Sequence, residues 1–316
     1  LFLELSIIRI HSSYFQLFAY FKNLSLLSCF LGLGIGYSFS RIRLFSLNWT
    51  FPIIALQVSF MFLLKETPVT LFFQNPISEI WNMGQSIAIG YLHITLIYFF
   101  IAVIFLLNAV AFVPLGHLVA RLMLNCNTLK AYSYDLIGAI LGIVLFTILS
   151  FLWTGPTVWL LISFAGLIFF QLNLRLNIKF NCISLVILIL SLNTFLDPDK
   201  MDLHSPYQNV SLKFSNDSNS PVEVKSNNLW LQTPINLSDE FYQKNNSSWH
   251  KFYIIPYVST NKKFEDILIV GSGTGNDVAA ALRNTKAQID AVEIDPLVAD
   301  IGVRLHPVSY THLTLP

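Results

Sequence analysis

Residues 267–295 read ILIVGSGTGNDVAAALRNTKAQIDAVEID, and this stretch decides the fold expected for the C-terminal part of the chain. The short apolar run at 267–270 is typical of a parallel strand that is covered on both faces. A glycine loop follows it, then a helix-forming segment and a second strand at 288–292. A strand, a helix and a second strand within about 30 residues predict the start of an α/β Rossmann-like domain.

The loop and the end of the second strand predict a site for an adenosine-containing cofactor. Glycines allow a tight turn and a close approach of the backbone to a ligand, and the amides at the start of the next helix can bind a polar group. Glu293, at the end of the second strand, can accept hydrogen bonds from both ribose hydroxyls. The predicted cofactor-binding residues are Gly271, Ser272, Gly273, Thr274, Gly275, Asn276, Asp277, Glu293 and Ile294.

Three interpretations of the loop compete. A dinucleotide fold uses the spacing G-x-G-x-x-G, whereas this loop has G-x-G-x-G followed by Asn276 and Asp277. A carboxylate beside the loop repels a pyrophosphate but suits the amine and sulfonium end of an S-adenosylmethionine-type ligand. The sequence therefore favours the adenosylmethionine type over a nicotinamide or flavin dinucleotide, and over a purely structural turn.

The composition of the rest of the chain predicts a membrane protein. Hydrophobic residues make up 54% of the 316 and charged residues only 12%, which is about half the charged fraction of a soluble globular chain. Apolar runs of bilayer-spanning length, about 17–25 residues, follow one another up to residue 196. After a partial helix at 1–10, the expected spans are six: 24–40, 44–64, 88–114, 132–151, 156–172 and 180–196.

Two features of these spans bear on packing and orientation. Gly32 and Gly36 have the small-xxx-small spacing that lets two membrane helices approach closely. Basic residues fall in alternate loops, at 41–43, 121–130 and 175–179, which the positive-inside rule places in the cytoplasm. With six spans and these loops in the cytoplasm, the C-terminal part would lie outside the cell. An adenosyl cofactor requires it inside, where the cofactor is. We give the cofactor more weight, and expect an integral protein of the bacterial inner membrane with a cytoplasmic C-terminal domain.

Other classes of protein and site are disfavoured. The formal net charge is +1, and no basic stripe indicates nucleic acid. Cys29, Cys126 and Cys182 are widely spaced, which suits neither a disulfide framework nor a metal site. The seven histidines show no ligand spacing, so no metal is expected. The opening LFLELSIIRI has the pattern of a helix already under way and not of a signal peptide, so part of a first membrane helix is expected to be missing.

After residue 196 the composition changes to polar segments with strand-like pieces. Residues 207–214, 221–225 and 228–232 alternate as short β-strands between turns rich in Asn and Ser. The expected organisation is a helical membrane region at 1–196, a small β-rich part at 197–262, the start of the Rossmann-like domain at 263–307, and a non-native tail at 308–316.

The segment 267–307, ILIVGSGTGNDVAAALRNTKAQIDAVEIDPLVADIGVRLHP, closely resembles the membrane-embedded relatives of spermidine synthase. These are polyamine aminopropyltransferase-like proteins in which several spans precede a Rossmann-like domain of the S-adenosylmethionine-dependent methyltransferase type. SPYQNVSLK at 205–213, NNLWLQTPINLSDEFY at 227–242 and KNLSLLSCFLGLGIGY at 22–37 also resemble this family. The resemblance covers nearly the whole chain and is strongest at 267–307.

The resemblance implies a reaction of polyamine biosynthesis, in which an aminopropyl group passes from decarboxylated S-adenosylmethionine to an amine such as putrescine. It implies that the three loop glycines line the cofactor and that Glu293 holds its ribose. It also implies that Gln208 and Asp239 belong to the substrate site. The expected partners are a small polyamine and the lipid bilayer, and a homo-oligomer is compatible with the sequence.

Two departures from the family pattern bear on activity. Soluble spermidine synthases have Asp at the fourth loop position, where this chain has Thr274. The family's general-base Asp lies beyond the fourth strand of its sheet, and this chain ends after the second, so we expect a fragment without a catalytic residue. The alternatives are a membrane-anchored methyltransferase that uses intact S-adenosylmethionine, and a transporter or sensor whose Rossmann-like domain only binds a ligand.

Overall fold

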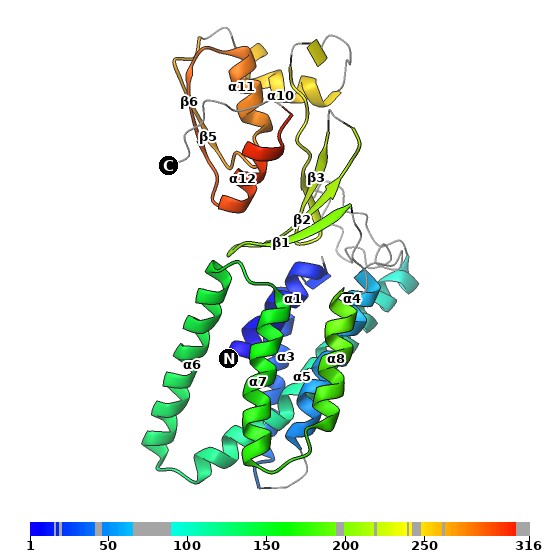
Figure 1. The fold of residues 1–316 in the computed structure, drawn as a ribbon, viewed down its shortest axis with the longest axis vertical. Coiled ribbons are helices and arrows are strands. Elements are labelled where there is room, and N and C mark those ends of the chain that lie inside the picture. The colour runs from blue at the N-terminus through cyan, green and yellow to red at the C-terminus, as the bar shows by residue number, and fades with distance from the viewer. Residues whose placement is uncertain are drawn as a thin grey trace. The chain divides into compact units, whose positions relative to one another are not determined.

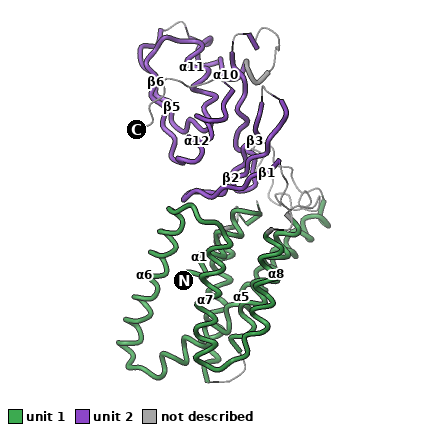
Figure 2. The backbone as a smooth tube through the Cα atoms, in the orientation of Figure 1, with its two compact units in different colours: residues 1–196 green, residues 197–316 purple. Residues whose placement is uncertain are grey.

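The chain divides into two compact units, Leu1–Leu196 and Asp197–Pro316 (Figure 2). The computed structural model describes residues 1–15, 17–18, 21–41, 46–65, 90–193, 199–217, 220–238, 240–241, 248–260 and 263–307. The boundary between the units coincides with the change from apolar runs to polar segments in the sequence.

Unit 1 is helical throughout the residues that are described (Figure 1). Its helices are α1 (Phe2–Tyr14), α3 (Lys22–Ser38), α4 (Thr50–Lys65, preceded by the 3₁₀ turn Leu47–Trp49), α5 (Tyr91–Leu124), α6 (Thr128–Phe151), α7 (Pro156–Asn173) and α8 (Lys179–Asn193). Among the described residues, four helical segments are long and apolar enough to cross a membrane: Leu47–Leu64, Tyr91–Leu124, Thr128–Phe151 and Pro156–Asn173. The apolar stretches Asn23–Ser38 and Lys179–Leu192 are shorter. Each of the six expected spans thus corresponds to one of these helices.

Helix α5 is longer than the sequence analysis predicted. The expected span ended at 114, at a proline, but the helix continues through Pro114 to Leu124. A proline removes one backbone hydrogen bond from a helix interior, and helices with apolar surroundings tolerate that loss where neighbouring groups compensate. The segment after Pro114 stays rich in leucine, which lets the helix go on for almost three more turns.

The predicted glycine face of α3 packs directly against α5. A Cβ atom on Gly32 would lie 2.1 Å from the carbonyl oxygen of Ala109, and one on Gly36 would lie 2.2 Å from that of Val113. On α5, a Cβ on Gly116 would lie 2.3 Å from the carbonyl oxygen of Leu33. These distances leave no room for a side chain, so the two backbones touch, as small-xxx-small spacing predicts.

A buried polar network crosses the interior of unit 1. The two ring nitrogens of His11 lie 2.9 Å from Ser25 Oγ and 2.9 Å from Gln57 Nε2. Asn108 Nδ2 donates to Ser28 Oγ at 2.6 Å and contacts Cys29 Sγ at 3.2 Å. In apolar surroundings such contacts tie helices together, because an unpaired polar group there is costly. The network joins α1, α3, α4 and α5.

The basic turns of unit 1 lie at one end of the bundle. The turns that follow α3, α5 and α7 meet at this end (Figure 1). The described cations there are Arg41, Arg121, Lys130, Arg175 and Lys179. Helix α8 begins at this end and runs to the opposite one (Figure 1), so the chain leaves unit 1 opposite its basic turns.

The first part of unit 2 is a four-stranded antiparallel sheet in the order β1-β2-β3-β4. Its strands are β1 (Lys200–His204), β2 (Asn209–Phe214), β3 (Val222–Ser226) and β4 (Leu229–Gln232), so the three predicted strands are present and β1 is additional. Asn227 and Asn228 both have positive φ, as a tight hairpin turn between β3 and β4 requires. The inward side chains of β2 and β3 are buried.

The second part of unit 2 contains β5 (Asp266–Val270), α11 (Asn276–Asn284) and β6 (Gln288–Val292), flanked by α10 (Ser248–Val258) and α12 (Pro296–Leu305). Strands β5 and β6 pair in parallel, from Asp266 with Gln288 to Val270 with Val292. Helix α12 packs against the antiparallel sheet, where Leu297, Val298 and Ile301 share a core with β2 and β3. The β-rich part and the segment after residue 263 therefore share one core.

The β5–β6 pair is covered on one face only, within the residues that the structure describes. Ile269 and Ala291 pack against the cluster around α10 and α11, whereas Leu268 and Val270 on the other face are 66% and 78% exposed. The expectation that the apolar run at 267–270 is covered on both faces is thus wrong for this structure. The physical reason is that α12 packs on the antiparallel sheet and leaves this face open.

Candidate functional site

The glycine loop connects β5 to α11 through three residues in the left-handed backbone region. Gly271, Gly273 and Gly275 have φ values of +71°, +57° and +97°, which side-chain-bearing residues rarely adopt. Gly275 is the N-cap of α11, so the third glycine sets the direction in which the helix leaves the loop. The loop is therefore glycine-rich because its backbone conformation requires it.

The backbone amides of the loop are directed to acceptors within the protein. The amides of Gly271 and Ser272 donate to the carbonyl of Val292 at 2.8 and 3.1 Å, and the amide of Gly275 donates to that of Ser272 at 2.9 Å. A loop that cradles phosphate instead presents its amides to the ligand. The first two of these amides hold the loop against the end of β6, and the amide of Gly275 closes a turn within the loop.

Glu293 joins the end of β6 to the glycine loop. Its Oε2 accepts the amide hydrogen of Gly273 at 2.8 Å, and its Oε1 accepts that of Asp295 at 3.0 Å. An ionised carboxylate has about four lone-pair positions, so each oxygen retains one position for a further donor. Glu293 is only partly buried. Two backbone donors thus fix the orientation of this acid before any ligand arrives.

Gln232, the last residue of β4, holds the centre of the loop. Its Oε1 accepts hydrogen bonds from the amide and the hydroxyl of Thr274, at 2.7 and 2.8 Å. The same oxygen lies 2.5 Å from where a Cβ on Gly273 would be. Thr274 is fully buried, so its side chain supports the loop and does not face a ligand. Gln232 lies in the segment 227–242 that resembles the family, but no sequence pattern predicted a role for it.

Asn276 is a hub of the structure beneath the loop. Its Nδ2 donates to the carbonyl of Thr233 at 2.9 Å and contacts Tyr253 Oη at 3.0 Å. Its Oδ1 accepts from the amide of Ile235 at 3.1 Å and lies 2.9 Å from His306 Nε2. The side chain is almost completely buried and uses its whole hydrogen-bonding capacity within the protein. The side chain of Asn276 therefore has no donor or acceptor left for the cofactor contact that the sequence predicted.

Gln208 is connected to the same region through Asp295. Its Nε2 donates to Asp295 Oδ2 at 2.8 Å, and its Oε1 accepts from the hydroxyl of Ser226. The hydroxyl of Ser205 also donates to Asp295 Oδ2, at 2.7 Å. Asp295 Oδ1 accepts from the amide of Leu297, which caps α12. Asp295 is buried, and its backbone amide donates to Glu293. Gln208 is therefore linked through Asp295 to Glu293, the ribose-binding candidate.

Asp277 brings negative charge to the first turn of α11. Burial raises the pKa of its carboxyl above the ordinary value of 3.8, and a backbone hydrogen bond partly opposes that change. Burial also raises the pKa of Tyr257, and the Asp277 carboxylate adds to this. Asp277 is exposed, so this desolvation is partial, and a cationic group nearby would favour its ionised form. It is the feature of the loop that most disfavours a phosphate ligand.

The remaining predicted site residues divide into three kinds. Ser272 is buried in the loop, and Ile294 is 73% exposed beside Glu293. Asp239 lies outside the described residues. Asp295 and His306 are functional residues that the sequence interpretation missed, and the buried contact of the His306 ring has no local sequence signal. Only the Asp-Pro pair at the start of α12 indicates the cap.

The arrangement suits a ligand with hydroxyl donors and a positive charge. Glu293 offers acceptors at the end of β6, and Asp277 offers negative charge in the first turn of α11. Among the described residues, no group of three or more His, Cys, Asp or Glu is arranged to hold a metal ion. Comparisons with family models, curated proteins and solved structures found no match to this chain.

Proposed function

We propose that residues 200–307 bind an S-adenosylmethionine-type ligand, and that the protein is a membrane-bound transferase similar to spermidine synthase. The donor would be decarboxylated S-adenosylmethionine, and the acceptor a polyamine such as putrescine. In this reaction the acceptor nitrogen bonds to the carbon beside the sulfonium, the carbon–sulfur bond breaks with its electron pair going to sulfur, and the amine loses a proton.

The observation that carries the proposal is the orientation of Glu293. Its carboxylate stands at the end of the second parallel strand, held by the amides of Gly273 and Asp295, with one acceptor position left on each oxygen. Two neighbouring acceptors match the two hydroxyls of a ribose. The same amide contact fixes the shape of the glycine loop, so ligand position and loop shape are set together.

The charge around the loop supports a cationic ligand over a dinucleotide. The amides of Gly271, Ser272, Gly273 and Thr274 donate to acceptors in the protein, which leaves few of them for a pyrophosphate. Asp277 adds a carboxylate that repels phosphate and attracts a sulfonium or an ammonium group. We assign these residues to binding, and we assign no catalytic residue among those that the structure describes.

A methyltransferase that uses intact S-adenosylmethionine is the second candidate, and Thr274 favours it. Soluble spermidine synthases have an Asp at this loop position, which contacts the amine end of the substrate. Thr274 carries no charge, is buried and is bonded to Gln232. A third candidate, a sensor or transporter, draws support from the polar network of His11, Gln57 and Asn108, because polar groups inside membrane bundles often serve function.

The apolar exterior of unit 1 supports placement in a bilayer. Helix α6 is the clearest case, because only 6% of its most apolar stretch is buried and its leucines and isoleucines face outward. We place residues 200–307 in the cytoplasm, where the ligand is made, and this puts the basic turns on the other side, against the positive-inside rule. Reporter fusions after Asn193 and within the α7–α8 turn would locate the two sides directly.

The reaction is tested on the complete gene product in two parallel assays. One supplies decarboxylated S-adenosylmethionine with labelled aminopropyl carbons and putrescine, and the other supplies S-adenosylmethionine with a labelled methyl group and putrescine. We expect labelled spermidine in the first assay and no methylated product in the second. The reverse result would replace the aminopropyl proposal with the methyltransferase. Absence of product in both, with ligand still bound, would favour the sensor.

A further inference from the structure

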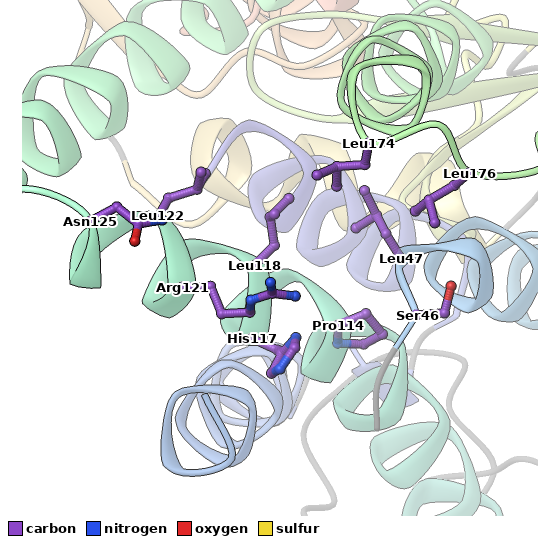
Figure 3. Close-up of a pocket in the computed structure, with 10 residues that line it drawn as sticks. All are labelled: Ser46, Leu47, Pro114, His117, Leu118, Arg121, Leu122, Asn125, Leu174 and Leu176. Carbon is purple, nitrogen blue, oxygen red and sulfur yellow. The ribbon is translucent and has the colours of Figure 1, made fainter. Parts of the chain in front are cut away.

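A cavity of about 490 Å³ lies at the basic end of unit 1. It is formed by one face of α5, by the segment before α4 and by the α7–α8 turn (Figure 3). The residues that line it are Ser46, Leu47, Pro114, His117, Leu118, Arg121, Leu122, Asn125, Leu174 and Leu176. Half of the lining residues are leucines, and the polar ones are Ser46, His117, Arg121 and Asn125. None of them belongs to the glycine-loop site.

The spacing of the α5 residues explains why they share one wall. Positions 114, 117, 118, 121, 122 and 125 recur every three or four residues, which places them on one face of a helix. The guanidinium of Arg121 lies between Leu118 and the ring of His117, on the cavity side of the helix (Figure 3). A charged group and apolar side chains therefore face the same space.

The opposite wall is fixed by a buried glutamine. Gln171 Nε2 donates to the carbonyl of Leu47 at 3.2 Å, and its Oε1 accepts from Asn181 Nδ2 at 2.6 Å. Gln171 has no exposed surface. The amide of Leu176 donates to the carbonyl of Gln171 at 2.9 Å, which anchors the α7–α8 turn to the same residue. The cavity is therefore a built feature of the bundle rather than a gap between loose turns.

The charge of the lining selects the sign of a ligand. No carboxylate is among the lining residues of the described chain. Other cations lie at the same end of the bundle, namely Arg41, Lys130, Arg175 and Lys179. The acidic residue of this end is Asp135, two turns into α6, and it does not line the cavity. The electrostatic potential of the cavity therefore favours an anion.

We propose that this cavity binds the headgroup of an anionic phospholipid from the surrounding bilayer. Arg121 would contact the phosphate, which a guanidinium can do through two parallel N–H donors. The leucine walls would cover the glycerol and the first methylene groups of the acyl chains. A basic cavity between apolar helices thus offers charge and N–H donors to a phosphate and apolar walls to the adjoining chains. The proposal is independent of whether residues 200–307 bind a cofactor.

The charge of Arg121 also has a simpler use. It stands in the last turn of α5, where a cation stabilises the negative end of the helix without any ligand. A role of that kind predicts that Arg121→Gln lowers helix stability but does not change lipid selectivity. Selectivity is therefore the readout that separates the two roles.

The test uses the full chain, purified in a neutral detergent and titrated with phosphatidylglycerol or with phosphatidylcholine of the same acyl chains. Native mass spectrometry counts the lipids retained. We expect the protein to retain phosphatidylglycerol in preference, and Arg121→Gln to reduce that preference about fivefold, as the loss of about 1 kcal/mol per basic residue implies. The matched control, Lys130→Gln, removes an exposed cation of the same end that does not line the cavity, and should leave the preference unchanged.

Two further arms identify the source of the anion and the place of binding. Leu122→Trp fills the cavity from a side chain that is 48% exposed, and should reduce retention of both lipids. Glycerol phosphate should not displace the lipid at equal concentration, because it lacks the acyl chains that the leucines cover. Arg121→Lys keeps the positive charge and should keep part of the preference for phosphatidylglycerol. It therefore separates an effect of the charge from an effect on folding. An unchanged preference in Arg121→Gln, or equal displacement by glycerol phosphate, would overturn the proposal.

Discussion

The amide of Gly273 donates a 2.8 Å hydrogen bond to Oε2 of Glu293, across twenty residues of sequence. This contact joins the centre of the glycine loop to the acid at the end of β6. It means that the loop conformation and the ribose-binding candidate cannot be altered separately. The glycine loop is further held by Gln232, whose Oε1 accepts both the amide and the hydroxyl of Thr274.

A side chain at Gly273 should disrupt this arrangement more than one at Gly271. Both residues have positive φ, but a Cβ at Gly273 would lie 2.5 Å from Gln232 Oε1, whereas a Cβ at Gly271 meets nothing within 4 Å. We expect Gly273→Ala to cost about 1–3 kcal/mol of local stability and Gly271→Ala about 1 kcal/mol. Hydrogen exchange of the α11 amides in the full chain measures both. Equal costs would show that Gln232 does not restrain the loop.

The carboxyl of Asp277 should make local stability depend on pH. Because its pKa is raised in the folded state, its contribution is present below its ordinary value of 3.8 and is lost as pH rises through the raised value. Asp277→Asn cannot ionise, so α11 in this variant should be more protected than in the parent at neutral pH. The difference in protection between the variant and the parent should vanish at a pH below the ordinary pKa of 3.8. Hydrogen exchange corrected for intrinsic rates at both pH values tests this, and a difference that does not depend on pH would contradict it.

The open face of the β5–β6 pair should tolerate polar substitution. Leu268 is 66% exposed, whereas its neighbour Ile269 packs against the cluster around α10 and α11. We expect Leu268→Ser to change stability by less than about 0.5 kcal/mol and Ile269→Ser to cost about 2–4 kcal/mol. Denaturant titration of the two variants side by side gives the comparison. A large cost at Leu268 would mean that other residues cover this face.

The contact between α3 and α5 should depend on individual glycines. A Cβ on Gly36 would lie 2.2 Å from the carbonyl oxygen of Val113, whereas one on Gly34 would meet nothing within 4 Å. We therefore expect Gly36→Leu to abolish a single monodisperse species in detergent, and Gly34→Leu to leave it intact. Size-exclusion chromatography of the two variants decides the matter. Similar profiles would show that these helices do not pack through Gly36.

Much of the fold follows from local sequence patterns. Apolar length located the six helices that match the expected spans, and alternation located β2, β3 and β4. The pair Gly32 and Gly36 indicated the close helix contact, because small residues at that spacing have few other uses in a span. The span expected at 88–114 was bounded by bilayer-spanning length, whereas α5 continues past Pro114 to Leu124, because a proline does not always break a helix in apolar surroundings.

The candidate site was less predictable than the fold around it. The spacing from the glycine loop to Glu293 is local, and the structure places the two in direct contact. The roles of Gln232, Asn276 and Asp295 depend on contacts between segments distant in sequence, which no local pattern encodes. Asn276 stands within the loop motif, yet its side chain is used by Thr233, Ile235, Tyr253 and His306. The position of Asn276 in the loop motif therefore predicted a side chain open to a ligand, whereas that side chain is buried.

The most direct measurement is equilibrium binding of labelled decarboxylated S-adenosylmethionine, and separately of S-adenosylmethionine, to the full chain and two variants. Glu293→Gln removes the charge and one acceptor oxygen, while the control Asp290→Asn removes an exposed carboxylate of the same strand. With variants of matched helical content, we predict that Glu293→Gln weakens binding about tenfold or more and that Asp290→Asn binds like the parent. Full affinity in Glu293→Gln, or no binding by the parent chain, would contradict the account.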